Sequence, residues 1–169
     1  YVWDLNKIDD ALDVYKNGLK EIPDSSELHV DICEVFYRRK DFKQIIDNAN
    51  KALELDKDIK GAHNYLGLVY RDEAKVDDAI KEFKAEIEIE INPDYYPYER
   101  LGFLFSEKKD YKEAIFYYKK AIELGSTLGC AYNNLAWYSI LENSEIDKTV
   151  DWATKAIELD PSHHGHIGV

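Results

Sequence analysis

Side chains that could do chemistry are few in this chain of 169 residues, and the clearest group lies near its C-terminus. His163, His164 and His166 stand close together, and neighbouring imidazoles can share a metal ion. No cysteine or carboxylate cluster with zinc-ligand spacing completes the set, so we interpret these histidines as part of a polar chain end. No phosphate-binding loop or nucleophile motif occurs either. The sequence therefore predicts no metal, no cofactor and no enzyme activity.

Composition limits the partners that the chain could bind. Asp and Glu number 34 against 22 Lys and Arg, which gives a formal net charge of -12. Nucleic-acid affinity depends on Lys and Arg displacing counterions from phosphates, so we expect no nucleic-acid partner. The apolar runs are short and interrupted by charge, whereas a membrane span needs about 20 apolar residues. We therefore expect no membrane span.

The elements that position these side chains follow from a repeat of 34 or 35 residues. One column of the repeat holds small residues, and the column three residues later is mostly aromatic. The first column holds Cys33, Gly67, Gly102 and Ala136, and the second holds Phe36, Tyr70, Phe105 and Ser139. A unit of this length cannot bury its apolar face alone and must stack on its neighbours. Two apolar stripes of helical spacing flank a short polar turn in each unit, which predicts an antiparallel helix pair and an all-α fold.

Turn and stop signals divide the chain at regular intervals. Turns within helix pairs are expected at 40–41, 74–75, 109–110 and 143–144, and breaks between pairs at Pro23, Lys57, Pro93, Ser126 and Pro161. We interpret 1–169 as a single domain with repeats at 25–58, 59–93, 94–127 and 128–161 and a tail at 162–169. Residues 1–24 are expected to form a partial repeat, mainly its second helix. A turn at 6–10 would leave 1–5 as the end of a first helix, which suggests a fragment of a longer protein.

The two cysteines, Cys33 and Cys130, lie almost three repeats apart. Helix layers stack at about 10 Å each, and a disulfide requires Cα atoms within about 7 Å, so these two residues cannot pair. Unpaired cysteines favour a reducing compartment such as the cytoplasm.

The segment 110–124, DYKEAIFYYKKAIEL, resembles tetratricopeptide repeat proteins at nearly every position. Similar segments occur at 6–23, 41–56, 62–70 and 152–161, so the resemblance covers almost the whole chain as four repeats and a preceding half. It implies a right-handed α-α superhelix, a solenoid of antiparallel helix pairs. Glu86, Ser139 and Thr149 depart from the family pattern, which usually has small or aromatic apolar residues in their columns.

In this family, the first helices of successive repeats line a concave groove that contacts an extended peptide or a partner helix. The resemblance therefore implies a non-catalytic scaffold for protein-protein interaction. The residues carried over to the groove are Val30, Glu34, Arg38, Asn64, Leu68, Arg71, Glu99, Phe103, Asn133, Trp137 and Ile140.

One groove column becomes more apolar towards the C-terminus, from Glu34 through Leu68 and Phe103 to Trp137. Large exposed apolar groups are typical of a recognition patch, so we expect the last three of these residues to anchor a ligand. Trp137 and Ile140 could instead pack beneath a further helix, because terminal repeats need a cap.

Polar residues on the same face suggest the chemistry of the partner. Asn64 and Asn133 could hydrogen-bond a ligand backbone, or they could be solvated. Acidic residues outnumber basic ones on this face, so the expected protein or peptide partner combines apolar anchors with Lys or Arg. Two alternatives remain open. The chain could be a regulatory or substrate-recruiting arm of a larger enzyme, or it could form a homo-oligomer through its ends or its aromatic groove.

Overall fold

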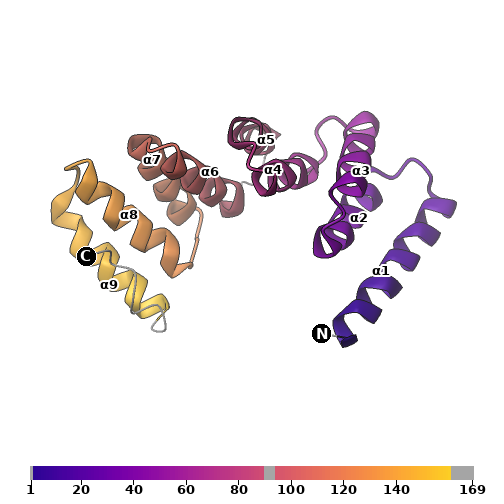
Figure 1. Cartoon of the computed structure of the whole chain (residues 1–169), viewed down its shortest axis with the longest axis horizontal. Helices are drawn as coiled ribbons and strands as arrows, with labels where there is room; N and C mark the ends of the chain where they lie inside the picture. The colour runs from indigo at the N-terminus through magenta and orange to yellow at the C-terminus, as the bar shows by residue number, and fades with distance from the viewer. Residues whose placement is uncertain (1, 90–93, 161–169) are drawn as a thin grey trace. The chain divides into compact units, whose positions relative to one another are not determined.

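The computed structural model describes residues 2–89 and 94–160, and every regular element within them is an α-helix (Figure 1). The prediction of an all-α fold is confirmed. The chain folds as two compact units, Tyr1–Ile89 and Glu90–Val169, which we call unit 1 and unit 2. Unit 1 contains α1 (Val2–Glu21), α2 (Ser26–Arg39), α3 (Phe42–Leu55), α4 (Ala62–Asp72) and α5 (Val76–Ile89). Unit 2 contains α6 (Tyr95–Glu107), α7 (Tyr111–Glu123), α8 (Gly129–Leu141) and α9 (Ile146–Leu159).

The predicted single domain and its repeat boundaries remain predictions. Two of the expected breaks between helix pairs, at Pro93 and Pro161, lie outside the described residues, and so does the expected tail at 162–169.

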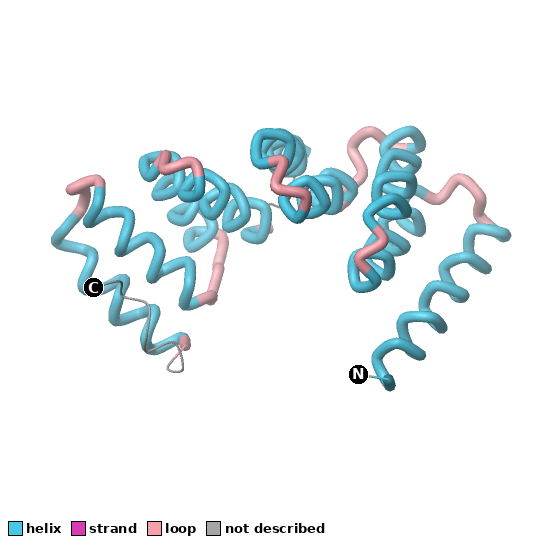
Figure 2. Tube along the Cα trace, viewed as in Figure 1, coloured by secondary structure: helices cyan, strands magenta, loops and turns pink. Residues whose placement is uncertain are grey.

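Helices within each unit pack mainly on their neighbours in the chain. In unit 1, α2 packs on α3 and α4 packs on α5, while α3 joins the two pairs and α1 covers α2. In unit 2, α6 packs on α7, α8 packs on α9, and α7 joins the pairs. Figure 2 shows the short loops that connect the two helices of each pair. Within each unit, the two pairs therefore bury part of their surface against each other, as the repeat predicts.

Each helix pair is closed by a tight turn that has a left-handed residue at the same position of the repeat. These residues are Lys40, Ala74, Lys109 and Asn143, with φ of 57°, 58°, 60° and 49°, and the α8–α9 turn has a second one, Glu145, with φ of 47°. The four predicted turn positions within helix pairs are confirmed. Asp41 and Asp110 follow two of these residues directly, and their side chains accept hydrogen bonds from the first-turn amides of α3 and α7. The aspartates therefore act as N-caps that fix where the second helix of a pair begins.

The first helix differs from the sequence prediction. The expected turn at 6–10 is wrong, because α1 is one continuous helix of 20 residues. Ile8, Ala11 and Tyr15 keep the spacing of a single apolar stripe, and all three pack against the core of unit 1. No glycine or proline occurs between residues 2 and 17. The helix therefore continues where the other pairs turn.

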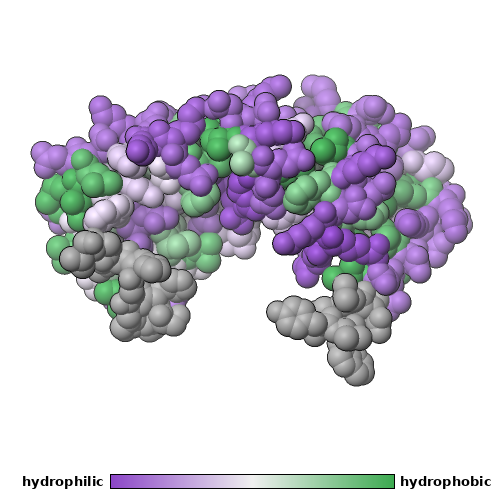
Figure 3. All heavy atoms as spheres, in the orientation of Figure 1, coloured by the Kyte–Doolittle hydropathy of each residue, from purple (hydrophilic) through white to green (hydrophobic). Residues whose placement is uncertain are grey.

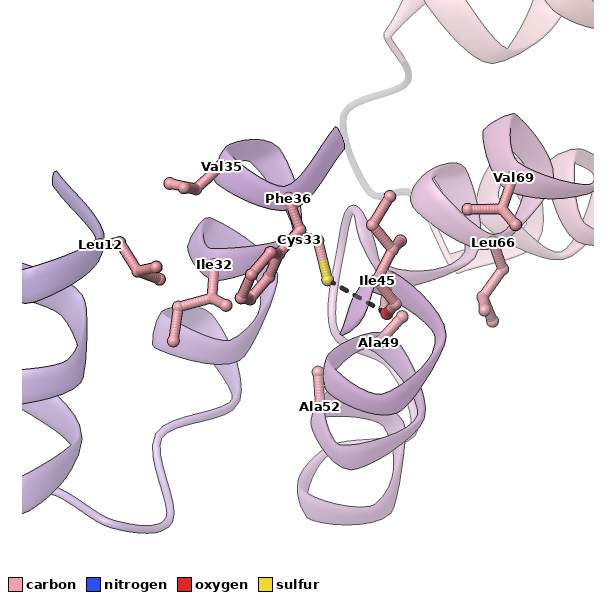
Figure 4. Close-up of a cluster of buried hydrophobic side chains, with 11 residues drawn as sticks. Leu12, Ile32, Cys33, Val35, Phe36, Ile45, Ala49, Ala52, Leu66 and Val69 are labelled. Carbon is pink, nitrogen blue, oxygen red and sulfur yellow. Dashed lines mark hydrogen bonds between the residues drawn. The ribbon is translucent and has the colours of Figure 1, made fainter. Parts of the chain in front are cut away.

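The core of unit 1 includes Cys33, the α2 member of the small-residue column (Figure 4). Cys33 is fully buried, and its Sγ donates a hydrogen bond to the Ile45 carbonyl oxygen at 3.6 Å. Burial raises the pKa of the Cys33 thiol to about 12. In the next pair, a Cβ added to Gly67 would lie 2.9 Å from the Phe83 ring. The glycine is therefore needed for α4 to approach α5 this closely.

Glu86 stands in a column that is otherwise filled by small residues, and it is only 2% exposed. Its carboxylate accepts hydrogen bonds from the amides of Gly61 at 2.7 Å and Asn64 at 2.9 Å. Gly61 is the N-cap of α4, has a φ of 95° and has no side chain that could cap the helix. A carboxylate also suits the positive end of the helix dipole. Glu86 therefore supplies from α5 the cap that α4 lacks.

The other two departures from the repeat pattern are buried in unit 2. Thr149 Oγ1 donates a hydrogen bond to the Ile146 carbonyl oxygen at 2.7 Å, so its hydroxyl is satisfied within α9. Ser139 is 0% exposed, and its Oγ has no hydrogen-bond partner among the described residues. A buried hydroxyl without a partner costs free energy of folding. Ser139 is therefore a weak point of α8.

Candidate functional site

In unit 1, the candidate residues with charged side chains already have partners within the chain. The Tyr65 hydroxyl donates a hydrogen bond to Glu34 Oε2 at 2.6 Å, and Arg38 Nε donates one to Glu34 Oε1 at 2.8 Å. The Tyr65 hydrogen bond is the main reason that the pKa of Glu34 lies below its ordinary value. Arg71 Nη2 donates to the Tyr37 hydroxyl at 2.8 Å. A ligand on this face would have to compete with a polar network between α2 and α4.

The uncharged candidates of unit 1 are less accessible than the sequence suggested. Val30 packs against the core, and Asn64 is half-buried at the start of α4. Leu68 is only 8% exposed, so the expectation of an exposed anchor there is wrong. The reason is that α4 packs against α2, α3 and α5 together, which leaves little of its surface free.

Glu99 on α6 also differs from the expectation of an acidic groove contact. It is 9% exposed, and its carboxylate accepts a hydrogen bond from Ser126 Oγ, in the loop before α8. Burial is the main cause that raises the pKa of Glu99 above its ordinary value. Its side chain therefore links α6 to the α7–α8 loop and is not offered to a ligand.

Exposed apolar side chains gather on the first helices of unit 2. Phe103 on α6 is 44% exposed, and Trp137 and Ile140 on α8 are 36% and 50% exposed. The 13 residues of α8 include no charged side chain, whereas α2, α4 and α6 each contain several ionisable residues. Figure 3 shows hydrophobic surface at the end of unit 2 that α8 and α9 form. A helix without charged side chains has no strongly hydrated face, so large apolar groups on it are normally covered.

A pocket of about 160 Å³ opens between α8 and α9. Three predicted residues, Asn133, Trp137 and Ile140, line it together with Ala136. The α9 side is lined by Thr149, Val150 and Ala153, which were not among the candidates predicted from the sequence. Their signal was present in the sequence, because Val150 and Ala153 occupy the same repeat columns as Ile115 and Tyr118. The structure therefore brings the C-terminal candidates together as one wall of a pocket shared with α9.

A second pocket, of about 250 Å³, lies between α1 and α2 in unit 1. Its lining includes the apolar residues Ile8 and Ala11 and the Tyr15 side chain, all from α1. Charged groups line it as well, since Lys7 contributes from α1 and Glu34 and Arg38 from α2. Because Glu34 and Arg38 are bonded to each other, this pocket is a more polar site than the one in unit 2.

Comparison with known proteins identifies the fold. A family model described as tetratricopeptide repeat matches residues 95–124, which include α6 and α7. YrrB, a tetratricopeptide-repeat protein with an unusual peptide-binding site, has a similar structure, with a TM-score of 0.80 and 19% identity over 90% of this chain and 78% of that chain. Residues 95–124 therefore match the tetratricopeptide-repeat family, and the chain as a whole shares the tetratricopeptide-repeat fold. The resemblance seen in the sequence is confirmed.

Structures of MamA share the tetratricopeptide-repeat fold of this protein. One matches with a TM-score of 0.75 and 21% identity, over 92% of this chain and 90% of MamA. MamA from Desulfovibrio magneticus RS-1 matches with a TM-score of 0.71 and 17% identity, over 94% of this chain and 88% of that chain. Sequence identities this low show only that the folds are similar. No curated protein sequence matches the chain.

Metal-binding side chains do not cluster in the described part of the chain. Within residues 2–89 and 94–160, no group of three or more His, Cys, Asp and Glu side chains is arranged to hold a metal ion. His163, His164 and His166 lie outside the described residues. Of the helices that the structure describes, none combines the length and apolar character needed to cross a membrane.

Proposed function

We propose that this protein is a non-catalytic scaffold that binds a peptide or helical segment of another protein. The proposed binding face is the concave side of unit 2, where the first helices α6 and α8 present Phe103, Trp137 and Ile140. The observation that carries the proposal is α8 itself, which has no charged residue and yet leaves Trp137 and Ile140 exposed. Exposed aromatic and aliphatic groups of this kind mark interaction sites more often than solvated surface.

The chemistry of the proposed face indicates the kind of segment it would bind. Phe103 and Trp137 are large enough to bury apolar anchors of a ligand, and the half-buried Asn133 offers both donors and acceptors to its backbone. The net charge of -12 favours ligands that carry Lys or Arg, because opposite charge steers association. YrrB, which shares the fold, is described as having a peptide-binding site, and this supports a similar use here.

Selection from a random peptide library would test the proposal. Peptides enriched on the purified chain are expected to combine apolar residues with Lys or Arg. Their dissociation constants would then be measured by fluorescence polarisation for the wild type and for the double variant Phe103→Glu, Trp137→Glu. We expect the double variant to weaken binding by about tenfold or more, since truncated anchors typically cost more than about 1 kcal/mol each.

A matched control variant is Phe116→Glu, because Phe116 is 50% exposed on α7 of the same unit. This control should bind the selected peptides as the wild type does. Equal affinities for the wild type and the double variant would contradict the proposed face. The mass of both proteins, measured by light scattering across a concentration series, would show whether a second copy is the ligand. In that case the wild type would be an oligomer and the double variant a monomer.

A further inference from the structure

The outer helix of unit 2, α9, carries an apolar stripe that the proposed groove does not use. Its residues are Ile146, Val150, Ala153 and Ile157, spaced by four, three and four positions along one face of the helix. Ile146 is 45% exposed, Val150 is 70% exposed and Ile157 is 52% exposed. We call these four residues the α9 stripe.

The equivalent stripe of α7 is an interface inside unit 2. Its residues, one repeat earlier, are Tyr111, Ile115, Tyr118 and Ile122. Helix α8 covers it, because the Tyr138 ring stacks on Tyr111 at 5.2 Å and on Tyr118 at 6.2 Å between ring centroids. Asn134 Nδ2 also donates a hydrogen bond to the Tyr118 hydroxyl at 3.0 Å. As a result, Ile115 is 8% exposed, whereas Val150 in the same column is 70% exposed.

The equivalent stripe of α3 is an interface inside unit 1. It consists of Phe42, Ile46, Ala49 and Leu53, all of which belong to or pack against the core of that unit. Helix α4, the first helix of the next pair, packs on α3. In both units, therefore, this column set is where the first helix of the following pair binds. The α9 stripe has the same pattern, but among the described residues no helix follows α9 to pack on it.

We infer that the α9 stripe binds an amphipathic helix of another protein, seated on α9 as α8 is seated on α7. Ala153 stands where Tyr118 stands in α7, so the bound helix would have to supply bulk that α9 lacks. The 160 Å³ pocket beside Ala153, Val150 and Ile140 has room for one large apolar side chain of that helix. This surface shares the pocket residue Ile140 with the proposed face, but its other contacts lie on α9 and it does not include Phe103.

Acidic residues next to the α9 stripe favour a partner helix that carries basic residues. Asp147, Asp151 and Glu158 follow the stripe residues by one position and form an exposed acidic row along the same edge of α9. Glu158 is paired with Lys155 at 3.0 Å, but both groups are about half-exposed, and such pairs contribute little. A basic row on the bound helix would complement this edge. A second copy is disfavoured, because two α9 helices related by a two-fold axis would place their acidic rows side by side.

The test uses two stapled helical peptides as probes. Both carry the apolar residues of α4 that belong to the core of unit 1, namely Ala62, Leu66 and Val69, in their native spacing. The remaining surface positions are Lys in one peptide and Glu in the other. Dissociation constants are measured by fluorescence polarisation with the full chain. We expect the Lys peptide to bind about tenfold or more tightly than the Glu peptide, with amide chemical-shift changes centred on residues 146–157.

Variants locate the binding surface. Val150→Gln should raise the dissociation constant of the Lys peptide about tenfold, because it places an uncharged polar group in the middle of the α9 stripe. Val14→Gln is the matched control, since Val14 is 67% exposed on α1 and lies in the other unit. Phe103→Glu distinguishes binding at the α9 stripe from binding in the proposed groove. It should leave the dissociation constant of the Lys peptide unchanged.

Four results would overturn the inference. Val150→Gln could bind the Lys peptide as the wild type does, which would place the site elsewhere. The two peptides could bind equally, which would remove the role of the acidic row. The wild type could be a dimer that Val150→Gln makes monomeric by light scattering, which would make a second copy the occupant. Loss of binding through Phe103→Glu alone would support the groove and contradict the α9 stripe.

Discussion

Replacing Glu86 by alanine should destabilise unit 1, although three other repeats have alanine at the equivalent position, namely Ala52, Ala121 and Ala156. The carboxylate of Glu86 is buried at 2% exposure and accepts two amide hydrogen bonds at the start of α4. Hydrogen bonds to charged groups contribute about 1.5 to 3 kcal/mol each, and losing an N-cap costs about 1 kcal/mol. Part of this is offset because a buried charge is removed. We expect a net loss of about 2 to 3 kcal/mol for Glu86→Ala.

The cap cannot be restored from Gly61 itself. Its φ of 95° disfavours side chains, and a Cβ there would lie 2.9 Å from Val30 Cγ1. A serine or aspartate at this position would therefore be strained before it could cap the helix. Glu86→Gln keeps one acceptor oxygen for the two amides, so we expect about half of the alanine loss.

Urea unfolding followed by far-UV circular dichroism would measure the loss in free energy of unfolding. Amide hydrogen exchange at Gly61 and Asn64 gives a local reading, because both amides would lose their acceptor and exchange faster. The control is Glu54→Ala on α3, whose side chain is 68% exposed and should cost less than about 0.5 kcal/mol. If Glu86→Ala were as stable as the wild type, the carboxylate would be a tolerated buried charge, and the capping argument would be refuted.

Three further predictions concern single side chains. Ser139→Ala should leave stability unchanged or raise it by up to about 1 kcal/mol, because the buried Oγ has no partner among the described residues; a fall in Tm would contradict this. Tyr65→Phe should cost about 1 kcal/mol at neutral pH and less in acid. The Tyr65 hydrogen bond lowers the pKa of Glu34 below 4.5, so the stability that Glu34 contributes is present above that pH and lost as the pH falls; pH-dependent urea unfolding should show a flatter acid limb in the variant. Iodoacetamide should modify Cys130 in the native protein before Cys33, because Cys130 is exposed, whereas Cys33 is buried with a pKa of about 12; mass spectrometry showing equal labelling would refute this.

Most of the helices could be predicted because their signals are local. The residues that close the helix pairs, from Lys40 to Asn143, stand where the apolar stripes stop, and the structure places each of them in the left-handed region. The predicted turn at 6–10 is wrong, because it followed the register of the repeat although the apolar stripe is not interrupted there. Ile8 continues the stripe of Ala11 and Tyr15, and that local signal outweighed the register of the repeat.

The sequence by itself determined the repeat, the helix pairs and the columns that face a neighbouring helix, because these depend on spacing along one chain. The tertiary structure decided which of those columns are covered. Leu68 is buried and Phe103 is exposed in one column, and Ile115 is buried and Val150 exposed in another. Residue type is similar within each column, so the difference comes from the helices packed around it. Glu86 makes the same point for polar groups, since its role depends on an α4 that begins with glycine and cannot cap itself.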